Sequence, residues 1–143
     1  QAGVSEAELR VRNVQTGEVQ SVPGDRTRPV NALEASDVDD LTSLRFLDEP
    51  NILHTLRIRF ARDAIYTYTG PILIVLNPWK DIAGLYDSAA MLIYNNKRKE
   101  KKSPHAFAMA SKAYECMRRA YLQRDLLCSS ADQAILVSGE SGA

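Results

Sequence analysis

The residues best suited to chemistry form a short glycine-rich segment after an apolar run. Residues 133–138 are expected to form a buried strand, and the segment that follows is Gly139, Glu140, Ser141, Gly142 and Ala143. A phosphate-binding loop needs such a turn between a strand and a helix, because its backbone amides surround the anion. The pattern also requires glycine, lysine and serine or threonine next, and these are not in the sequence. On these five residues alone, an ordinary strand-to-helix turn is the commoner structure.

A second segment has the residue types of a purine site. Asn77, Pro78, Trp79 and Lys80 end an apolar run, and Tyr86 follows a little later. An asparagine can hydrogen-bond a base, aromatic rings can stack on it, and a lysine can cover its edge. The competing interpretation is a plain turn with Trp79 filling a surface hollow. On chemistry alone the plain turn is favoured.

Composition excludes several other classes of function. The 143 residues carry 18 basic and 18 acidic side chains, so bulk charge gives no sign of a nucleic-acid or membrane surface. No apolar run approaches the roughly 18 residues of a membrane helix, and no signal peptide opens the sequence. Cys116 and Cys128 have no metal-like spacing and are interpreted as reduced thiols, with a single disulfide between them as the alternative. The basic run at 97–102 is interpreted as a surface loop, and His54 and His105 as structural residues.

Turn and capping residues predict the elements of the first half. Residues 18–22 should form a half-exposed strand between two turn signals, and an acidic linker with Leu41, Leu44 and Leu47 should lead into a short helix. A firmer helix should follow, capped by Asp48 or Glu49 with Pro50 in its first turn. Its expected apolar face consists of Ile52, Leu53, Leu56 and Phe60.

The second half predicts a sheet and two more helices. Residues 65–69 and 72–76 read as consecutive strands of a largely buried sheet. A short helix is expected at 88–94, capped by Asp87 or Ser88. Ser103 should cap a longer helix with Pro104 at its first position. The expected buried face of that helix consists of Phe107, Ala110, Tyr114, Met117 and Tyr121.

Several segments, taken in order, resemble the motor domain of the myosins. They are Val38–Leu44, Leu47–His54, Ile65–Gly70, Asn77–Lys80, Ser103–Ala108 with Ala113 and Tyr114, and Ile135–Ala143. Each is weak alone, but their order over most of the chain makes the resemblance specific.

The resemblance implies a fold class and a division of the chain. The expected fold is α/β, a partial P-loop motor domain with a twisted central sheet, preceded by a remnant of a small SH3-like β-barrel. The expected domains are residues 1–33 for the barrel remnant and linker, and residues 34–143 for the N-terminal part of the motor domain. Because the sequence opens on Gln1 and closes within the loop pattern, we expect it to be a piece of a longer chain.

The resemblance also implies a function, an ATP-dependent motor that moves on actin. The phosphate-binding residues would be Gly139, Glu140, Ser141, Gly142 and Ala143, and the adenine-binding residues Asn77, Pro78, Trp79, Lys80 and Tyr86. ATP and Mg²⁺ would be the cofactors of the complete motor. This piece would hold no catalytic or metal-binding residue and would be inactive alone.

The implied partners follow the same family. They are the actin filament, contacted through regions outside this sequence, and light chains or calmodulin in the full protein. Nucleic acid and direct membrane insertion are not expected, and the implied location is the cytoplasm and cytoskeleton, in a myosin complex.

Two departures from the family pattern affect these expectations. Asn77 and Tyr86 lie one residue further apart than is usual, which weakens the role of Tyr86. The stretch 118–133 is longer than usual and indicates a divergent myosin class or a faulty gene model. Two alternatives stay open at this point, a different P-loop ATPase and a non-enzymatic adaptor domain that ends at Ala143.

Overall fold

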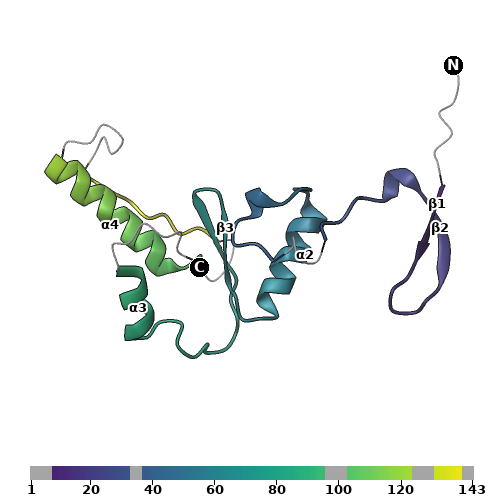
Figure 1. The fold of residues 1–143 in the computed structure, drawn as a ribbon, viewed down its shortest axis with the longest axis horizontal. Helices are drawn as coiled ribbons and strands as arrows, with labels where there is room; N and C mark the ends of the chain where they lie inside the picture. The colour runs from purple at the N-terminus through teal and green to yellow at the C-terminus, as the bar shows by residue number, and fades with distance from the viewer. Residues whose placement is uncertain (1–7, 33–36, 96–102, 124–130, 140–143) are drawn as a thin grey trace, which may run out of the picture.

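The computed structural model describes residues 8–32, 37–95, 103–123 and 131–139. It is a mixed α/β structure in which two separate two-stranded antiparallel sheets alternate with helices. Figure 1 shows the first hairpin at one end of an elongated chain, α2 in the middle, and α3 and α4 at the other end.

The first hairpin consists of β1 (Glu8–Arg12) and β2 (Val19–Pro23), and a short 3₁₀ turn at Gly24–Arg26 follows it. Its turn uses Asn13, whose side-chain oxygen accepts from the Gln15 amide at 2.9 Å. The strand expected at 18–22 is confirmed to within one residue. Most of the hairpin is exposed, and two strands do not make a barrel. The SH3-like barrel remnant therefore stays a prediction.

Helix α2 (Glu49–Phe60) begins as its sequence predicts but buries a different face. Asp48 caps it by accepting from the Asn51 amide at 3.0 Å, and Pro50 lies in its first turn. The predicted apolar face is wrong for Leu53 and Phe60, which are 67% and 40% exposed, while Ile52 and Leu56 are half-buried. The buried residues of this helix are instead Asn51, Thr55 and Arg59, which recur every four positions.

Asn51 is buried because it hydrogen-bonds to the linker that precedes the helix. Its side-chain oxygen accepts from the Asn31 backbone amide at 3.0 Å, and its side-chain nitrogen donates to the Pro29 carbonyl at 3.0 Å. Asn31 in turn accepts from the Phe46 amide at 3.0 Å and donates to the Phe46 carbonyl at 2.9 Å. Buried amides with their hydrogen bonds satisfied in this way hold two distant segments together.

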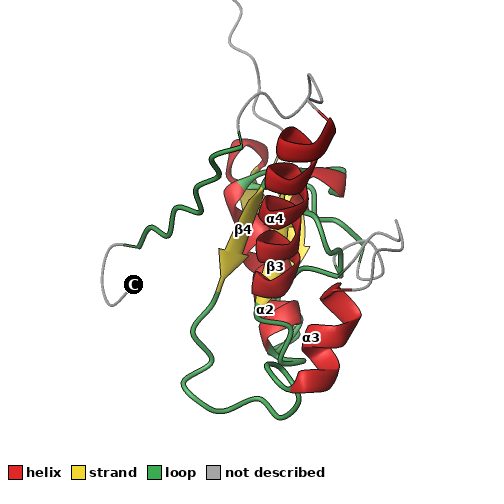
Figure 2. Cartoon of the chain, turned by 90° about the vertical axis from the view of Figure 1, so that its left-hand side faces the viewer, coloured by secondary structure: helices red, strands yellow, loops and turns green. Residues whose placement is uncertain are grey.

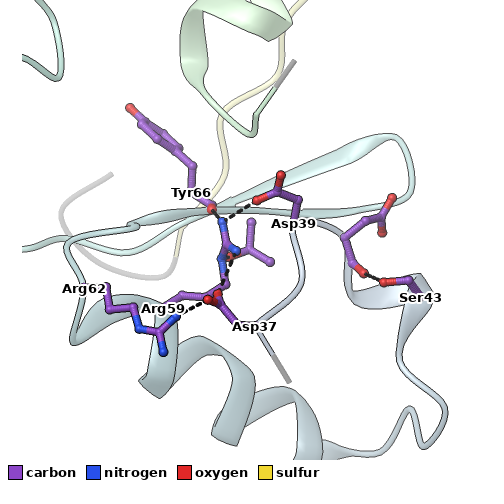
Figure 3. A network of polar contacts seen from close by, with 8 residues as sticks. Asp37, Asp39, Ser43, Arg59, Arg62 and Tyr66 are labelled. Atoms are coloured by element: carbon purple, nitrogen blue, oxygen red, sulfur yellow. Dashed lines mark hydrogen bonds and ion pairs between the residues drawn. The ribbon is translucent and has the colours of Figure 1, made fainter. Parts of the chain in front are cut away.

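Arg59, at the other end of the same face, makes a second network, shown in Figure 3. Its side chain is 7% exposed and donates to the Thr67 hydroxyl at 2.9 Å and to the Tyr66 carbonyl at 3.0 Å. It also pairs with the carboxylates of Asp37 at 3.4 Å and Asp39 at 3.0 Å. We call these five residues the Arg59 cluster. The cluster joins α2, the linker and the next strand.

The second hairpin, β3 (Tyr66–Thr69) and β4 (Ile72–Val75), follows α2 with Gly70 at its turn. The two predicted strands are confirmed. The sheet was expected to be largely buried, but only β3 is. β3 is buried or half-buried, whereas Ile72 and Val75 of β4 are 62% and 56% exposed. Gly70 has a φ of 60°, a left-handed conformation that glycine adopts at low cost.

The small core forms where the linker meets β3. The Tyr68 amide donates to the Asp39 carbonyl at 2.8 Å, and a 3₁₀ turn at Leu41–Ser43 follows. The buried apolar residues of the described structure are Leu41, Leu44, Ile65 and Tyr66. The short helix predicted after the linker is thus a single 3₁₀ turn. Two of the three leucines that suggested it, Leu41 and Leu44, are buried. Leu47 is 54% exposed.

Helices α3 (Ser88–Asn95) and α4 (Ala106–Gln123) complete the fold, and Figure 2 shows α4 in front of the β3–β4 hairpin with α3 beside it. Asp87 caps α3 as predicted, accepting from the Ala90 amide at 2.7 Å. The predicted start of α4 is wrong. Ser103 and Pro104 precede the helix, and His105 provides the cap, its Nδ1 accepting from the Phe107 amide at 2.9 Å.

The predicted buried face of α4 is also wrong beyond its first turn. Ala110 is exposed, and Tyr114, Met117 and Tyr121 are 58%, 39% and 80% exposed. Phe107 alone of this set lies against other rings, those of Tyr86 and Tyr94. An apolar face is buried only where another element covers it, and the described elements contact α4 mainly through its first turns.

The last described segment, residues 131–139, forms no strand. Ile135, Leu136 and Val137 are 57%, 91% and 78% exposed, so the buried strand predicted at 133–138 is wrong for this structure. A strand needs a neighbour to pair its backbone groups, and the described chain offers this segment no strand beside it. Among the described residues, no helix is long and apolar enough to span a membrane.

Candidate functional site

The loop that follows β4 presents an indole ring to solvent. The side-chain oxygen of Asn77 accepts from the Trp79 amide at 2.9 Å, a local bond that closes a tight turn. Trp79 has a φ of 53° and is 88% exposed. A left-handed conformation is uncommon for a bulky residue, so the turn holds the Trp79 backbone in an unusual conformation from which the side chain extends into solvent. The interpretation in which Trp79 fills a surface hollow is therefore wrong.

Lys80 connects this loop to the end of α2. Its Nζ lies 2.6 Å from the Oδ1 of Asp63, and both side chains are about half exposed. Asp63 is the second residue of this region with a left-handed backbone, with a φ of 60°. Just beside the pair, the Leu76 amide donates to the Ile65 carbonyl at 3.0 Å and prolongs the hairpin towards the loop.

Tyr86 lies in a different environment from the other four predicted adenine residues. Its hydroxyl is 2.6 Å from the hydroxyl of Tyr66, and its ring centroid is 5.7 Å from that of His105 and 6.1 Å from that of Phe107. With Tyr94, these residues form what we call the aromatic cluster. In the described chain the contacts of Tyr86 are made to this cluster, so the structure does not bring Tyr86 together with Trp79.

His105 at the centre of the aromatic cluster is held as one neutral tautomer. Its Nε2 is 2.9 Å from the Leu85 carbonyl, which can only accept, and its Nδ1 is 2.9 Å from the Phe107 amide, which can only donate. The proton must therefore sit on Nε2. Burial lowers the pKa of His105 below its usual value. Burial likewise raises the pKa of Tyr66, and the hydrogen bond with Tyr86 adds to that increase.

The predicted phosphate segment is only partly within the described structure. Gly139 is exposed, and residues 140–143 lie outside the described residues. In the described ranges no group of three or more histidine, cysteine or acidic side chains is arranged to hold a metal ion.

A shallow hollow of about 210 Å³ lies between the β3–β4 turn and the start of α4. It is lined by Asp40, Tyr68, Gly70, Pro71, Ala108, Met109 and Lys112. None of the residues predicted to bind nucleotide lines it, so the hollow and the Asn77–Lys80 loop are separate features.

Sequence reasoning missed Asp63 as a neighbour of the predicted site. The residue follows the end of α2 and precedes β3, and 17 positions separate it from Lys80. No local pattern pairs two such residues. The only signal was topological, because a hairpin returns its second strand to the point where its first strand began.

Comparison with known proteins agrees with this arrangement of segments. Residues 38–143 match the myosin head (motor domain) family. The chain is 40% identical over 129 residues to Myosin-13 of Arabidopsis thaliana and 40% identical over 115 residues to Unconventional myosin-VI of Homo sapiens. It is 41% identical over 105 residues to Myosin-4 of Saccharomyces cerevisiae. This chain belongs to the myosin motor-domain family, and the predicted membership is confirmed.

The matches cover most of this chain but little of the relatives. They span 90%, 80% and 73% of this chain, in the same order, and 8%, 8% and 6% of the three relatives. The residues described here therefore correspond to a small part of proteins that are far longer.

Proposed function

We propose that this chain supplies the purine side of the ATP site in an actin-based motor. The observation that carries the proposal is the Asn77–Lys80 loop, which follows β4 with Trp79 88% exposed and with its backbone held in a tight turn by Asn77. Family membership gives this loop its context, since the match covers residues 38–143 and includes both candidate segments.

The chemistry of the loop suits a purine. The oxygen of the Asn77 amide is occupied by the Trp79 amide, and within the described residues its side-chain nitrogen remains available to donate to a base nitrogen. The Trp79 ring can stack on the base, and an aromatic that is exposed before binding gains apolar contact on binding. Tyr86 stays a member of the proposed site on family grounds alone, because its hydroxyl is already paired with Tyr66.

The phosphate side of the proposed site is the segment Gly139–Ala143. Its backbone amides would surround the phosphates, and Mg²⁺ bound with ATP would neutralise charge on the phosphate oxygens. The complete motor would place both segments on a twisted central sheet, with residues 34–143 in the motor domain and residues 1–33 in a barrel remnant and linker before it. No residue of this chain is assigned a catalytic step.

The remaining parts of the proposal concern the whole protein. ATP hydrolysis coupled to movement on actin, light chains or calmodulin as partners, and a place in the cytoskeleton all follow from the family. A P-loop ATPase of another family is excluded by the membership of this chain. The 143-residue chain alone is expected to show no ATPase activity, because the lysine and hydroxyl of the phosphate-loop pattern are not in it.

The test is to replace Asn77 by aspartate in the complete motor chain. Aspartate keeps the oxygen that accepts from the Trp79 amide but lacks the nitrogen that would donate to adenine. We expect the KM for ATP to rise several-fold with little change in kcat, because the purine lies far from the bond that breaks. Asn13→Asp, in the turn of the first hairpin, is the matched control. A lower kcat at unchanged KM would overturn the assignment.

A further inference from the structure

Two residues with an unusual backbone conformation are associated with one ion pair at the proposed purine loop: Asp63 is one end of the pair, and Trp79 precedes the other end, Lys80. Among the described residues other than glycine, only Asp63 and Trp79 have a positive φ, 60° and 53°. The Lys80 ammonium, next to Trp79, lies 2.6 Å from the Asp63 carboxylate. Residues in sparsely populated conformations persist where surrounding interactions hold them, and they concentrate at functional sites.

The ion pair gives Lys80 a different role from the one expected of it. A lysine free in solution samples many rotamers and can move over the edge of a bound base. Here its ammonium group is paired with a carboxylate in the turn between α2 and β3, although the Lys80 side chain is still 55% exposed. On its other side the loop is closed by the bond from the Trp79 amide to Asn77. The two interactions thus hold the loop at the backbone of Trp79 and at the residue that follows it.

We infer that Asp63 is a positioning residue for nucleotide binding, which acts on the Trp79 ring through Lys80 without touching the nucleotide. This inference rests on the proposed function of the Asn77–Lys80 loop. The ordering of the loop by the ion pair lowers the entropy that binding must remove, so it raises affinity for the base. Since both side chains are about half exposed, added salt weakens the pair and the advantage it gives.

The expected effect is small and measurable. Exposed ion pairs contribute at most about 1 kcal/mol, which corresponds to a change in affinity of about two- to fivefold. The effect belongs to the affinity for ATP and not to kcat, because the loop contacts the base and not the reacting phosphate.

The experiment uses Asp63→Asn in the complete motor chain. Asparagine tolerates the left-handed backbone as well as aspartate does, so the substitution removes the charge and leaves the turn. Asp81→Asn is the matched control, because Asp81 is an exposed carboxylate directly after Lys80. We expect Asp63→Asn to raise the KM for ATP about two- to fivefold at low salt and to leave kcat unchanged. The Asp81→Asn protein should match the parent.

Two further measurements separate positioning from general damage. Inorganic tripolyphosphate has no base, so its binding should be the same in the parent and in Asp63→Asn. Lys80→Met should weaken ATP binding as Asp63→Asn does, and the double variant should be no weaker than either single variant, because both changes remove one interaction. Equal weakening of ATP and tripolyphosphate, or additive effects in the double variant, would overturn the inference.

The failure of this inference can be told from the failure of the proposed function. If Asn77→Asp weakens ATP binding and Asp63→Asn does not, the loop binds purine and Asp63 plays no part in it. If neither substitution changes the affinity for ATP, the purine assignment of the loop is itself wrong, and this inference is wrong with it.

Discussion

Replacement of Arg59 by methionine should loosen the contact between the linker and β3. Methionine fills much of the same volume but donates no hydrogen bond. The guanidinium of Arg59 now donates to the Thr67 hydroxyl and the Tyr66 carbonyl, and both of those residues are buried, at 1% and 5% exposure. The substitution therefore leaves two buried polar groups without their present partner.

The free-energy cost of Arg59→Met depends on whether each former partner of Arg59 can hydrogen-bond to water instead. A buried group left without its hydrogen bond costs about 1–3 kcal/mol, so the hydroxyl and the carbonyl together cost about 2–6 kcal/mol. The carboxylates of Asp37 and Asp39 are 34% and 46% exposed and recover water instead. Their loss adds at most about 1 kcal/mol each. A value of about 3–4 kcal/mol corresponds to a change of roughly 100- to 1,000-fold in a local opening equilibrium.

The assay is amide hydrogen exchange at Tyr68, whose amide donates to the Asp39 carbonyl at 2.8 Å across the contact in question. Exchange reports local opening and stays interpretable in a chain that does not unfold in two states. We expect protection of Tyr68 to fall by roughly two orders of magnitude or more in Arg59→Met. Arg62→Met is the control, because that side chain is 65% exposed.

A second substitution tests the source of the loss. In the Arg59→Met background, Thr67→Val removes one of the two orphaned groups and should recover part of the protection. If protection of Tyr68 in Arg59→Met stays within a few-fold of the parent, the cluster contributes only as a surface ion pair does, and the reasoning is refuted.

The remaining predictions concern pH and the phosphate segment. Hydrogen bonds from the Asn51 backbone and side chain lower the pKa of Asp48 below 3.8, so its cap is complete above that pH and is lost as the pH falls through the lowered pKa. Amide exchange at Asn51 should follow this loss, and in Asp48→Ser it should not. Burial lowers the pKa of His105 below 6.5, so the neutral cap of α4 is complete above 6.5 and is lost as the pH falls through the lowered value. Protection of the Phe107 amide should fall about fivefold on that protonation and stay constant in His105→Asn; a constant value in the parent would contradict this. In the complete motor, Gly142→Val should abolish binding of a fluorescent nucleotide while thermal unfolding stays normal, and full affinity in a folded variant would remove the phosphate-loop assignment.

Element positions were predictable where a local signal sets them. Asp48 and Pro50 mark the start of α2, Asp87 marks the start of α3, and Gly70 marks the turn between β3 and β4. Each of these signals acts over three or four residues, so the sequence contains all of it. The start of α4 was predicted wrongly because His105, a rare cap, accepts from Phe107 where Ser103 was expected to act.

Buried faces were not predictable, because they depend on partners far away in the sequence. Apolar periodicity suggested Leu53 and Phe60 for α2, yet the helix buries Asn51 and Arg59, whose partners lie 22 and 8 residues away at Pro29 and Thr67. Apolar spacing in α4 and in residues 133–138 is real, but in the described chain the face of α4 is covered only at Phe107 and residues 135–137 stay exposed.

The candidate site was predictable only as far as its motif. Family resemblance singled out Asn77 to Lys80. The hydrogen bond from the Trp79 amide to the Asn77 side chain shows that these residues form a local turn. The same resemblance grouped Tyr86 with them, whereas the fold pairs its hydroxyl with that of Tyr66. Asp63 carried no signal, because its contact with Lys80 exists only after the hairpin has folded.

The polar face of α2 restricts how this segment can vary between related proteins. The Asn51 side chain hydrogen-bonds to backbone groups of both Asn31 and Pro29. An apolar side chain at position 51 would therefore leave the Pro29 carbonyl, 22 residues upstream, without this hydrogen bond. Drift at position 51 is therefore tolerated only with a matching change near position 31. The length of chain between Asn31 and Asp48 is constrained in the same way, since an insertion there must still return Phe46 to Asn31. We expect covariation of positions 31 and 51, and few length changes between them, to distinguish this linker from an ordinary surface loop.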